Sequence, residues 1–237
     1  MNTAYGWMAL AGIGLSLWCW TRLARRDERL VFIYVFALIC AFAGAKLVYL
    51  FAEAHTVKTR ADFWTQIATG KSVLGALLGG YAGVEIAKRL IGYRRATGDW
   101  FAIVAPMGIV LGRIGCFFHG CCLGRVCDPA WYTMLDAEGK NRWPAVPMEI
   151  GFNLLFLILA AALRVRGTFP GQHFHFYLIS YGLFRFGHEF MRATPATFGA
   201  FSGYQIAALA VAALGTVRFW QRRKATPAIE IVQQKRG

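Results

Sequence analysis

Stretches of mostly apolar residues, each about as long as a membrane-spanning helix, recur along this chain and are separated by short polar connections. They cover approximately residues 4–21, 30–52, 72–90, 100–122, 148–163, 174–190 and 198–219. A helix that crosses the hydrocarbon core of a bilayer needs about 20 such residues. The sequence therefore predicts an all-α, polytopic membrane helix bundle of about seven transmembrane helices over residues 1–219, followed by a basic tail over residues 220–237.

The chain carries 26 lysine and arginine residues against 12 aspartate and glutamate residues, a formal net charge of +14. Such an excess suits a nucleic-acid partner if the cations share one folded face, or a membrane protein if they lie in loops on one side. Most of these cations follow the first, third, fifth and seventh stretches. The positive-inside rule then places the N-terminus outside and the C-terminus in the cytoplasm. This distribution excludes a nucleic-acid partner, and 57% hydrophobic against 16% charged residues excludes a soluble globule.

Charged side chains inside the apolar stretches are costly, about 2.5–3.5 kcal/mol each on insertion scales, and so indicate functional positions. Lys46, Arg113 and Arg185 all fall in the extracytoplasmic half of the bilayer in this orientation. Tyr181, Arg185 and Glu189 recur four residues apart on one helical face, where Arg185 and Glu189 could neutralise each other. Arg113 has no carboxylate in its own stretch. Two arginines at one depth predict a bound anion, for which a phospholipid phosphate in the outer leaflet is the natural candidate.

The densest group of reactive side chains lies within residues 112–125. It comprises Cys116, His119, Cys121 and Cys122, with Cys127 just beyond, and is interrupted by Gly112, Gly115, Gly120 and Gly124. The cysteine spacing matches no zinc pattern, and adjacent cysteines seldom ligate one tetrahedral ion, so no metal is expected. A disulfide from Cys127 to Cys121 or Cys122 would suit an oxidising face. In the catalytic interpretation His119 is a general base or a thiolate is a nucleophile.

Several motifs follow one another along the chain in a fixed order. They are Tyr5-Gly6, Gly44-Ala45-Lys46-Leu47, the segment Ser72 to Gly80, Gly112-Arg113-Ile114-Gly115 with Gly120 and Gly124-Arg125, Pro147-Met148-Glu149, and Tyr181-Gly182-Leu183-Phe184-Arg185-Phe186 with Glu189 and Arg192. This ordered set resembles the bacterial phosphatidylglycerol to prolipoprotein diacylglyceryl transferases.

The resemblance implies transfer of a diacylglyceryl group from phosphatidylglycerol, an anionic phospholipid, to a cysteine thiol of a lipoprotein precursor. Glycerol phosphate would leave, and no imported cofactor is needed. The site would face the extracytoplasmic leaflet of the bacterial inner membrane. Catalytic residues expected from the motifs and from the reactive segment are Arg113, Arg185, Tyr181, His119, Cys116 and Cys121. Expected substrate-binding residues are Arg113, Arg185, Tyr5, Lys46, Glu189, Gly112, Gly115 and Gly124.

Two departures from the family pattern leave alternatives open. Leu74 stands where the family carries a histidine, and leucine cannot move a proton. Cys116, His119 and Cys121 stand where the family has two asparagines and a glutamate. Either His119 has become the base, or the chain is a paralogue whose Cys/His site acts on another acceptor. The cysteines leave three such changes open: a covalent intermediate on Cys121 or Cys122, redox gating, or metal-assisted activation of a thiol or water. A non-catalytic lipid-binding membrane protein and a membrane thiol redox protein are further alternatives.

Overall fold

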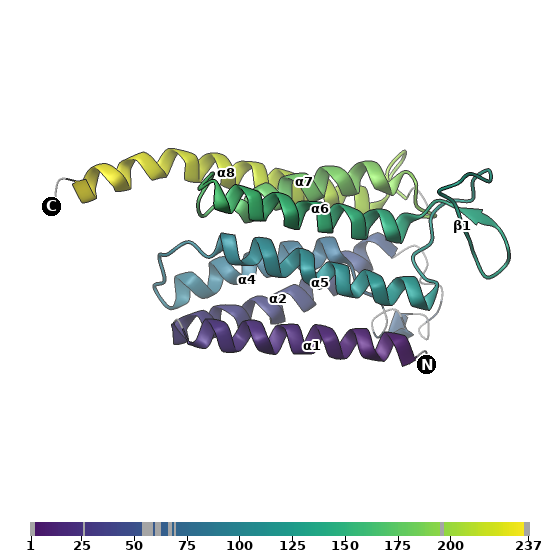
Figure 1. Ribbon diagram of the computed structural model, residues 1–237, viewed down its shortest axis with the longest axis horizontal. Helices are drawn as coiled ribbons and strands as arrows, with labels where there is room; N and C mark the ends of the chain where they lie inside the picture. Colours follow the sequence, from purple (N-terminus) through teal and green to yellow (C-terminus); the bar gives the residue numbers. More distant parts are fainter. Residues whose placement is uncertain are drawn as a thin grey trace.

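The computed structural model describes residues 3–25, 27–53, 59, 63–65, 68, 70–194 and 197–234. Long helices run roughly along the longest axis of the molecule (Figure 1). They are α1 (Thr3–Ala24), α2 (Glu28–Glu53), α4 (Val73–Leu90), α5 (Gly98–His119), α6 (Ala145–Val165), α7 (His173–Glu189) and α8 (Gly203–Gln234). A small antiparallel hairpin of β1 (Met134–Leu135) and β2 (Asn141–Arg142) connects α5 to α6 and projects from one end of the bundle.

The long helices coincide with the apolar stretches, which confirms the all-α prediction at the level of helix positions. Among the described residues, α2, α5 and α6 are both long enough and apolar enough to cross a membrane. The chain is therefore a helical membrane protein. α8 begins five residues later than predicted and continues to Gln234, so most of the expected basic tail is helical.

The end of α5 differs from the prediction. The helix ends at His119, where the sequence predicts a span that continues to Cys122. Gly120 adopts a left-handed φ of 68°, and the Cys121 N–H donates to the carbonyl of Cys116 at 3.2 Å. Glycine takes this conformation without steric cost and commonly terminates helices in this way. Cys121 and Cys122 therefore lie in a turn beyond the helix.

Glycines bring α2 and α4 into close contact. A Cβ added to Gly44 would overlap the carbonyl oxygen of Gly75, and one added to Gly79 would overlap the carbonyl oxygen of Cys40. Small residues spaced in this way allow helix backbones in a membrane to approach closely. The prediction that the Gly-rich stretch packs inside the bundle is confirmed.

The remaining helices pack as neighbours in space: α7 on α8, α5 on α6, and α1 on α5. The largest core cluster contains fully buried Tyr177, Leu178, Tyr181 and Val211. This packing fixes α5, α6 and α7 relative to one another. Because the helices alternate in direction, the end of α5, the start of α6 and the end of α7 meet at the hairpin end of the bundle (Figure 1).

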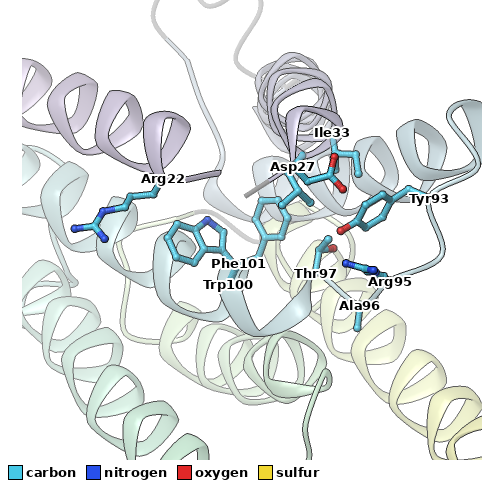
Figure 2. Close-up of a pocket in the computed structure, with 10 residues that line it drawn as sticks. Arg22, Asp27, Ile33, Tyr93, Arg95, Ala96, Thr97, Trp100 and Phe101 are labelled. Atoms are coloured by element: carbon cyan, nitrogen blue, oxygen red, sulfur yellow. The ribbon is translucent and has the colours of Figure 1, made fainter. Parts of the chain in front are cut away.

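A cavity of about 240 Å³ lies at the opposite end, between the α1–α2 and α4–α5 connections. Figure 2 shows the carboxylate of Asp27 near the ring of Tyr93, whereas Arg22 extends away from both. Arg22 and Arg95 belong to the loop cations that the sequence assigns to the cytoplasmic side. The buried charges that the sequence marks as functional lie at the hairpin end, so we place the candidate site there.

Candidate active site

A buried carboxylate, Glu149, lies at the centre of a charged cluster at the hairpin end. Glu149 comes from the first turns of α6 and has no exposed surface. The Nε of Arg113, from α5, lies 3.0 Å from its Oε2, and the Nε of Arg185, from α7, lies 4.0 Å from its Oε1. Both arginines are themselves buried, with 8% and 4% of their surface exposed. One carboxylate thus joins three helices.

Hydrogen bonds hold Glu149 in this position. The hydroxyl of Tyr181 donates to its Oε1 at 2.6 Å. Four residues along α6, the side-chain amide of Asn153 donates to the Glu149 carbonyl at 2.8 Å. Asn153 in turn accepts a 2.7 Å hydrogen bond from the hydroxyl of Tyr177. These buried, mutually bonded groups restrict Glu149 to one orientation, which a charge in a low-dielectric interior requires.

The pairing considered as an alternative for Arg185 and Glu189 on α7 is present. Arg185 Nη1 lies 2.6 Å from Glu189 Oε2, and Arg192 Nε lies 3.6 Å from the same oxygen. Arg185 therefore bridges Glu189 on its own helix and Glu149 on α6. The cluster contains three guanidiniums and two carboxylates, so one positive charge is left over when all are ionised.

Arg113 has a carboxylate partner on another helix, which its sequence context does not predict. Arg113 has no carboxylate in its own helix, but Glu149 of the neighbouring helix supplies one at 3.0 Å. An anion is therefore not needed to explain why Arg113 is tolerated in the bundle. The argument for an anion rests on the surplus positive charge of the cluster and on the large cavity that Arg113 faces.

This cavity has a volume of about 1220 Å³ and is lined by α1, α2, α4 and α5. Its lining is mostly apolar along the bundle and becomes polar at the hairpin end. The polar lining there includes Arg113, Cys116, His119, Cys121 and Cys122. Ligand pockets commonly measure about 300–1,000 Å³ and combine apolar walls with a few polar groups. This cavity is large enough for a ligand with long apolar chains and a polar head.

The turn after α5 gathers three thiols. The Sγ atoms of Cys116, Cys121 and Cys122 all lie within 4.8 Å of one another. Cys122 has a φ of 62°, a left-handed conformation that costs a non-glycine residue about 1–2 kcal/mol. Hydrogen bonds from the Cys116 and Cys121 thiols and the nearby positive charge of Arg113 lower the pKa of the Cys122 thiol. All six cysteines are free, so the disulfide considered for Cys127 is not formed in this structure.

The other expected binding residues occupy different places. Gly112 lines the cavity. Gly115 is buried in α5, and Gly124 packs so closely that a Cβ there would overlap the carbonyl oxygen of Trp143. Lys46 donates from Nζ to the carbonyl of Ala68 at 3.1 Å. The expectation for Tyr5 lies outside the described side chains.

Leu74 stands at the position where the sequence motifs lead one to expect a histidine, and its apolar side chain cannot transfer a proton. Leu74 is 1% exposed and belongs to the main core cluster. Two histidines, His119 and His188, follow shortly after the cluster arginines Arg113 and Arg185 in the sequence. His119 lines the cavity, whereas His188 is buried, stacks on Phe184 with ring centroids 5.0 Å apart, and has no hydrogen-bond partner for either ring nitrogen within the described ranges.

Glu149 belongs to the motif Pro147-Met148-Glu149, but neither Glu149 nor Asn153 is among the site residues that the sequence predicts. A usable signal existed, because Glu149 is the single carboxylate in the apolar helix that α6 forms. Asn153 follows four residues later on the same face and is the other strongly polar side chain buried there.

Comparisons with known proteins agree with the site. A family model described as prolipoprotein diacylglyceryl transferase matches residues 3–221. A relative from Geobacter sulfurreducens is 39% identical over 139 residues, which cover 56% of this chain and 53% of the relative. A relative from Rhodospirillum rubrum is 30% identical over 94% of this chain and 90% of its own length. One from Pseudoalteromonas translucida is 28% identical over 84% of this chain and 79% of its own length. All three are named phosphatidylglycerol–prolipoprotein diacylglyceryl transferase.

Proposed function

Because this chain belongs to the prolipoprotein diacylglyceryl transferase family, we propose that it moves a diacylglyceryl group from phosphatidylglycerol to the cysteine thiol of a lipoprotein precursor. Glycerol phosphate is the leaving group. One observation carries this proposal: Arg113 links the buried charged cluster around Glu149 to the polar end of the large apolar cavity. The family match supports this transferase activity over a purely lipid-binding role and over a thiol redox role.

The cavity suits a phospholipid because its two ends differ in chemistry. Acyl chains would lie against the apolar walls formed by residues such as Leu77, Val104 and Ile109. The phosphate would then reach Arg113, whose planar guanidinium can bind two phosphate oxygens at once. The surplus positive charge of the cluster favours this anion, and Arg185 contributes to that charge from behind Glu149.

The reaction breaks the bond between the glycerol C3 carbon of the diacylglyceryl group and the phosphate oxygen. The acceptor sulfur attacks that carbon, and the bonding electrons leave with the phosphate oxygen. Arg113 would stabilise the negative charge that grows on this oxygen, and such stabilisation is large in a site shielded from water. His119, which lines the same end of the cavity, is the side chain placed to accept the thiol proton.

We further infer that all the long helices cross the bacterial inner membrane, with the N-terminus outside and the C-terminus in the cytoplasm. Cations concentrate at the end of the bundle opposite the hairpin, as at Arg22, Lys88, Arg89 and Arg164, each in the last turn of its helix. The positive-inside rule assigns that end to the cytoplasm. The hairpin end, with Arg113 and the cavity opening, would then serve the extracytoplasmic leaflet.

A conservative substitution tests the role of Arg113. Arg113→Lys keeps the positive charge beside Glu149 but removes the planar fork that binds two oxygens. We expect kcat to fall about 10²-fold, the scale of losing one transition-state donor, with little change in folding. The assay incubates purified protein with labelled phosphatidylglycerol in vesicles and a peptide that carries one acceptor cysteine, and measures thioether-linked product.

Arg89→Lys is the matched control, because Arg89 is an exposed arginine in the last turn of α4, at the other end of the bundle. It should retain the activity of the unmodified protein. Equal activity of Arg113→Lys and Arg89→Lys would contradict the phosphate role of Arg113. Absence of product from the unmodified protein across several anionic phospholipids and cysteine peptides would contradict the transferase activity itself.

A further inference from the structure

The three clustered thiols at the end of α5 have no part in the transfer step proposed above. Their sulfur atoms lie within 4.8 Å of one another, all three side chains are partly buried, and all three line the polar end of the cavity. The cluster joins residues five and six positions apart, Cys116 on the helix and Cys121 and Cys122 beyond it. It is therefore a product of the turn rather than of a regular helical face.

Backbone geometry explains how two adjacent cysteines reach the same point. The left-handed Gly120 reverses the chain at the end of α5, and the Cys121 N–H binds back to the carbonyl of Cys116. Cys122 then adopts its own left-handed φ of 62°. In a regular helix or strand, adjacent side chains point in different directions. Here the turn folds both thiols back over Cys116, which removes the geometric objection that sequence spacing raised against a shared ligand.

The separation of the sulfurs is close to what a metal ion requires. Zinc binds cysteine sulfur at about 2.3 Å in a tetrahedron, so two ligand sulfurs stand about 3.8 Å apart. Sulfurs that already lie within 4.8 Å reach that spacing through small side-chain rotations. Thiolate sulfur is a soft ligand that selects zinc and similar ions over magnesium or calcium.

We propose that Cys116, Cys121 and Cys122 bind one thiophilic metal ion of the zinc class as thiolates. Three protein ligands leave a fourth position open, the arrangement of catalytic rather than purely structural zinc sites. The cavity borders all three cysteines, so the open position faces the space where substrate enters. In a step that rests on the proposed function, the acceptor thiol occupies this fourth position.

The arginines of the charged cluster lie close to this site. Three thiolates and a divalent ion carry one net negative charge, and the neighbouring cluster of three arginines and two glutamates carries one surplus positive charge. Arg113 lies three residues before Cys116 and hence on the same face of α5. Both side chains line the cavity. The metal site and the phosphate site would thus be adjacent.

The transfer step involves bond exchange and proton transfer, with no oxidation or reduction. The acceptor S–H bond breaks when the sulfur coordinates, and its proton passes to His119. The resulting thiolate forms a bond to C3 of the glyceryl group while the C3–oxygen bond breaks, and the electron pair leaves on glycerol phosphate beside Arg113. Thiol activation by coordination would supply what Leu74 cannot, because a bound thiol is deprotonated near neutral pH.

Metal binding tests the site directly and needs no turnover. Reduced, metal-free protein in detergent or nanodiscs is titrated with Co²⁺, whose bonds to thiolates give a near-ultraviolet charge-transfer absorption. We expect one ion per chain. Alkylation followed by mass spectrometry should show Cys116, Cys121 and Cys122 protected when Zn²⁺ is present, while Cys127 reacts either way.

Variants provide the matched comparison. Cys116→Ser, Cys121→Ser and Cys122→Ser should each weaken Co²⁺ binding more than about 100-fold, beyond the 10- to 100-fold effect of losing a supporting residue. Cys127→Ser, which alters a free cysteine outside the cluster, should bind like the unmodified protein. Because the alkylation test uses the unmodified chain, it decides the question even if a variant fails to fold. Binding below one ion per chain, or three thiols that stay reactive with Zn²⁺, would overturn the proposal.

A peptide experiment separates the metal site from the transferase activity. Adding a cysteine acceptor peptide to the Co²⁺ protein should shift the charge-transfer absorption, and the serine version of the peptide should not. A shift without product would uphold the site and count against the proposed transfer. Product formation by protein that binds no metal would uphold the transfer and refute the site. Metal binding with no shift would refute the assignment of the fourth ligand.

Discussion

Replacing Glu149 by glutamine removes one negative charge from the centre of the bundle and leaves the shape of the side chain nearly unchanged. Glutamine can still accept a hydrogen bond from Tyr181, which lies 2.6 Å from the carboxylate in the structure. Its amide cannot neutralise Arg113 at 3.0 Å or Arg185 at 4.0 Å. The substitution therefore isolates the charge of Glu149 from its packing.

The expected cost follows from the burial of all the partners. Glu149 has no exposed surface, and the two arginines expose less than a tenth of theirs. Removing one member of a buried ion pair typically costs about 3–5 kcal/mol, because the remaining charge stays buried without compensation. Here two guanidiniums lose their shared partner, and Glu189 alone remains to balance three arginines. We expect the free energy of unfolding to fall by about 3–5 kcal/mol.

Reversible unfolding in mixed detergent micelles, followed by circular dichroism, measures this loss. Glu138→Gln is the matched control, because Glu138 lies in the hairpin and its ion pair with Lys140 is largely exposed. Exposed pairs contribute about 0–1 kcal/mol. A double variant that also carries Arg113→Gln should be less destabilised than the sum of the two single variants, since it removes one charge of each sign. Equal stability of Glu149→Gln and Glu138→Gln would refute the central role of the carboxylate.

Two further predictions concern the cavity and the hairpin. Gly108→Phe should lower transfer activity at unchanged stability, because Gly108 lines the cavity and a Cβ there meets only open space. Gly151→Phe, at an exposed glycine of α6 with equally open surroundings, is the control, and equal activity of the two variants would exclude a lipid path along α5. In the hairpin, the Arg142 guanidinium and two backbone N–H groups hold the pKa of Asp136 below its usual value. Because the pKa of Asp136 is lower in the folded hairpin than in the unfolded chain, where it is about 3.9, its ionised carboxylate stabilises the hairpin at pH values above about 3.9. This stabilisation is lost as the pH falls through the pKa of the folded state. Amide exchange of residues 134–142, corrected for intrinsic rates, should therefore stay slow down to about pH 4 and speed up below it, and Asp136→Asn should exchange faster at neutral pH. An unchanged exchange rate in Asp136→Asn would contradict this role.

Features that depend on local sequence could be predicted for this chain. Helix positions follow from apolar stretches of membrane-spanning length, and the Arg185–Glu189 pair follows from the spacing of four residues on one helix. The close packing of α2 and α4 follows from the density of small residues. Each of these depends on residues that are neighbours in the chain or on one helical face.

Features that depend on the meeting of separate helices could not be predicted in the same way. The partner of Arg113 is Glu149 on the next helix, and which residues of α5 and α6 face each other is set by packing throughout the bundle. The thiol cluster depends on the φ angles of Gly120 and Cys122, and a positive φ at a cysteine has no sequence signal. Hydropathy identifies the charged residues that are unfavourable to insert into a membrane, but it does not predict which residues form ion pairs with them.

The distribution of the central charges over α5, α6 and α7 has a consequence for biosynthesis. Arg113 leaves the ribosome some 36 residues before Glu149 does, and Arg185 follows later still. While α5 is in the bilayer without α6, its arginine carries the full insertion penalty of about 2.5–3.5 kcal/mol with no carboxylate to offset it. Insertion of α6 brings Glu149 to Arg113, so α5 is more stable in the membrane once α6 has joined it.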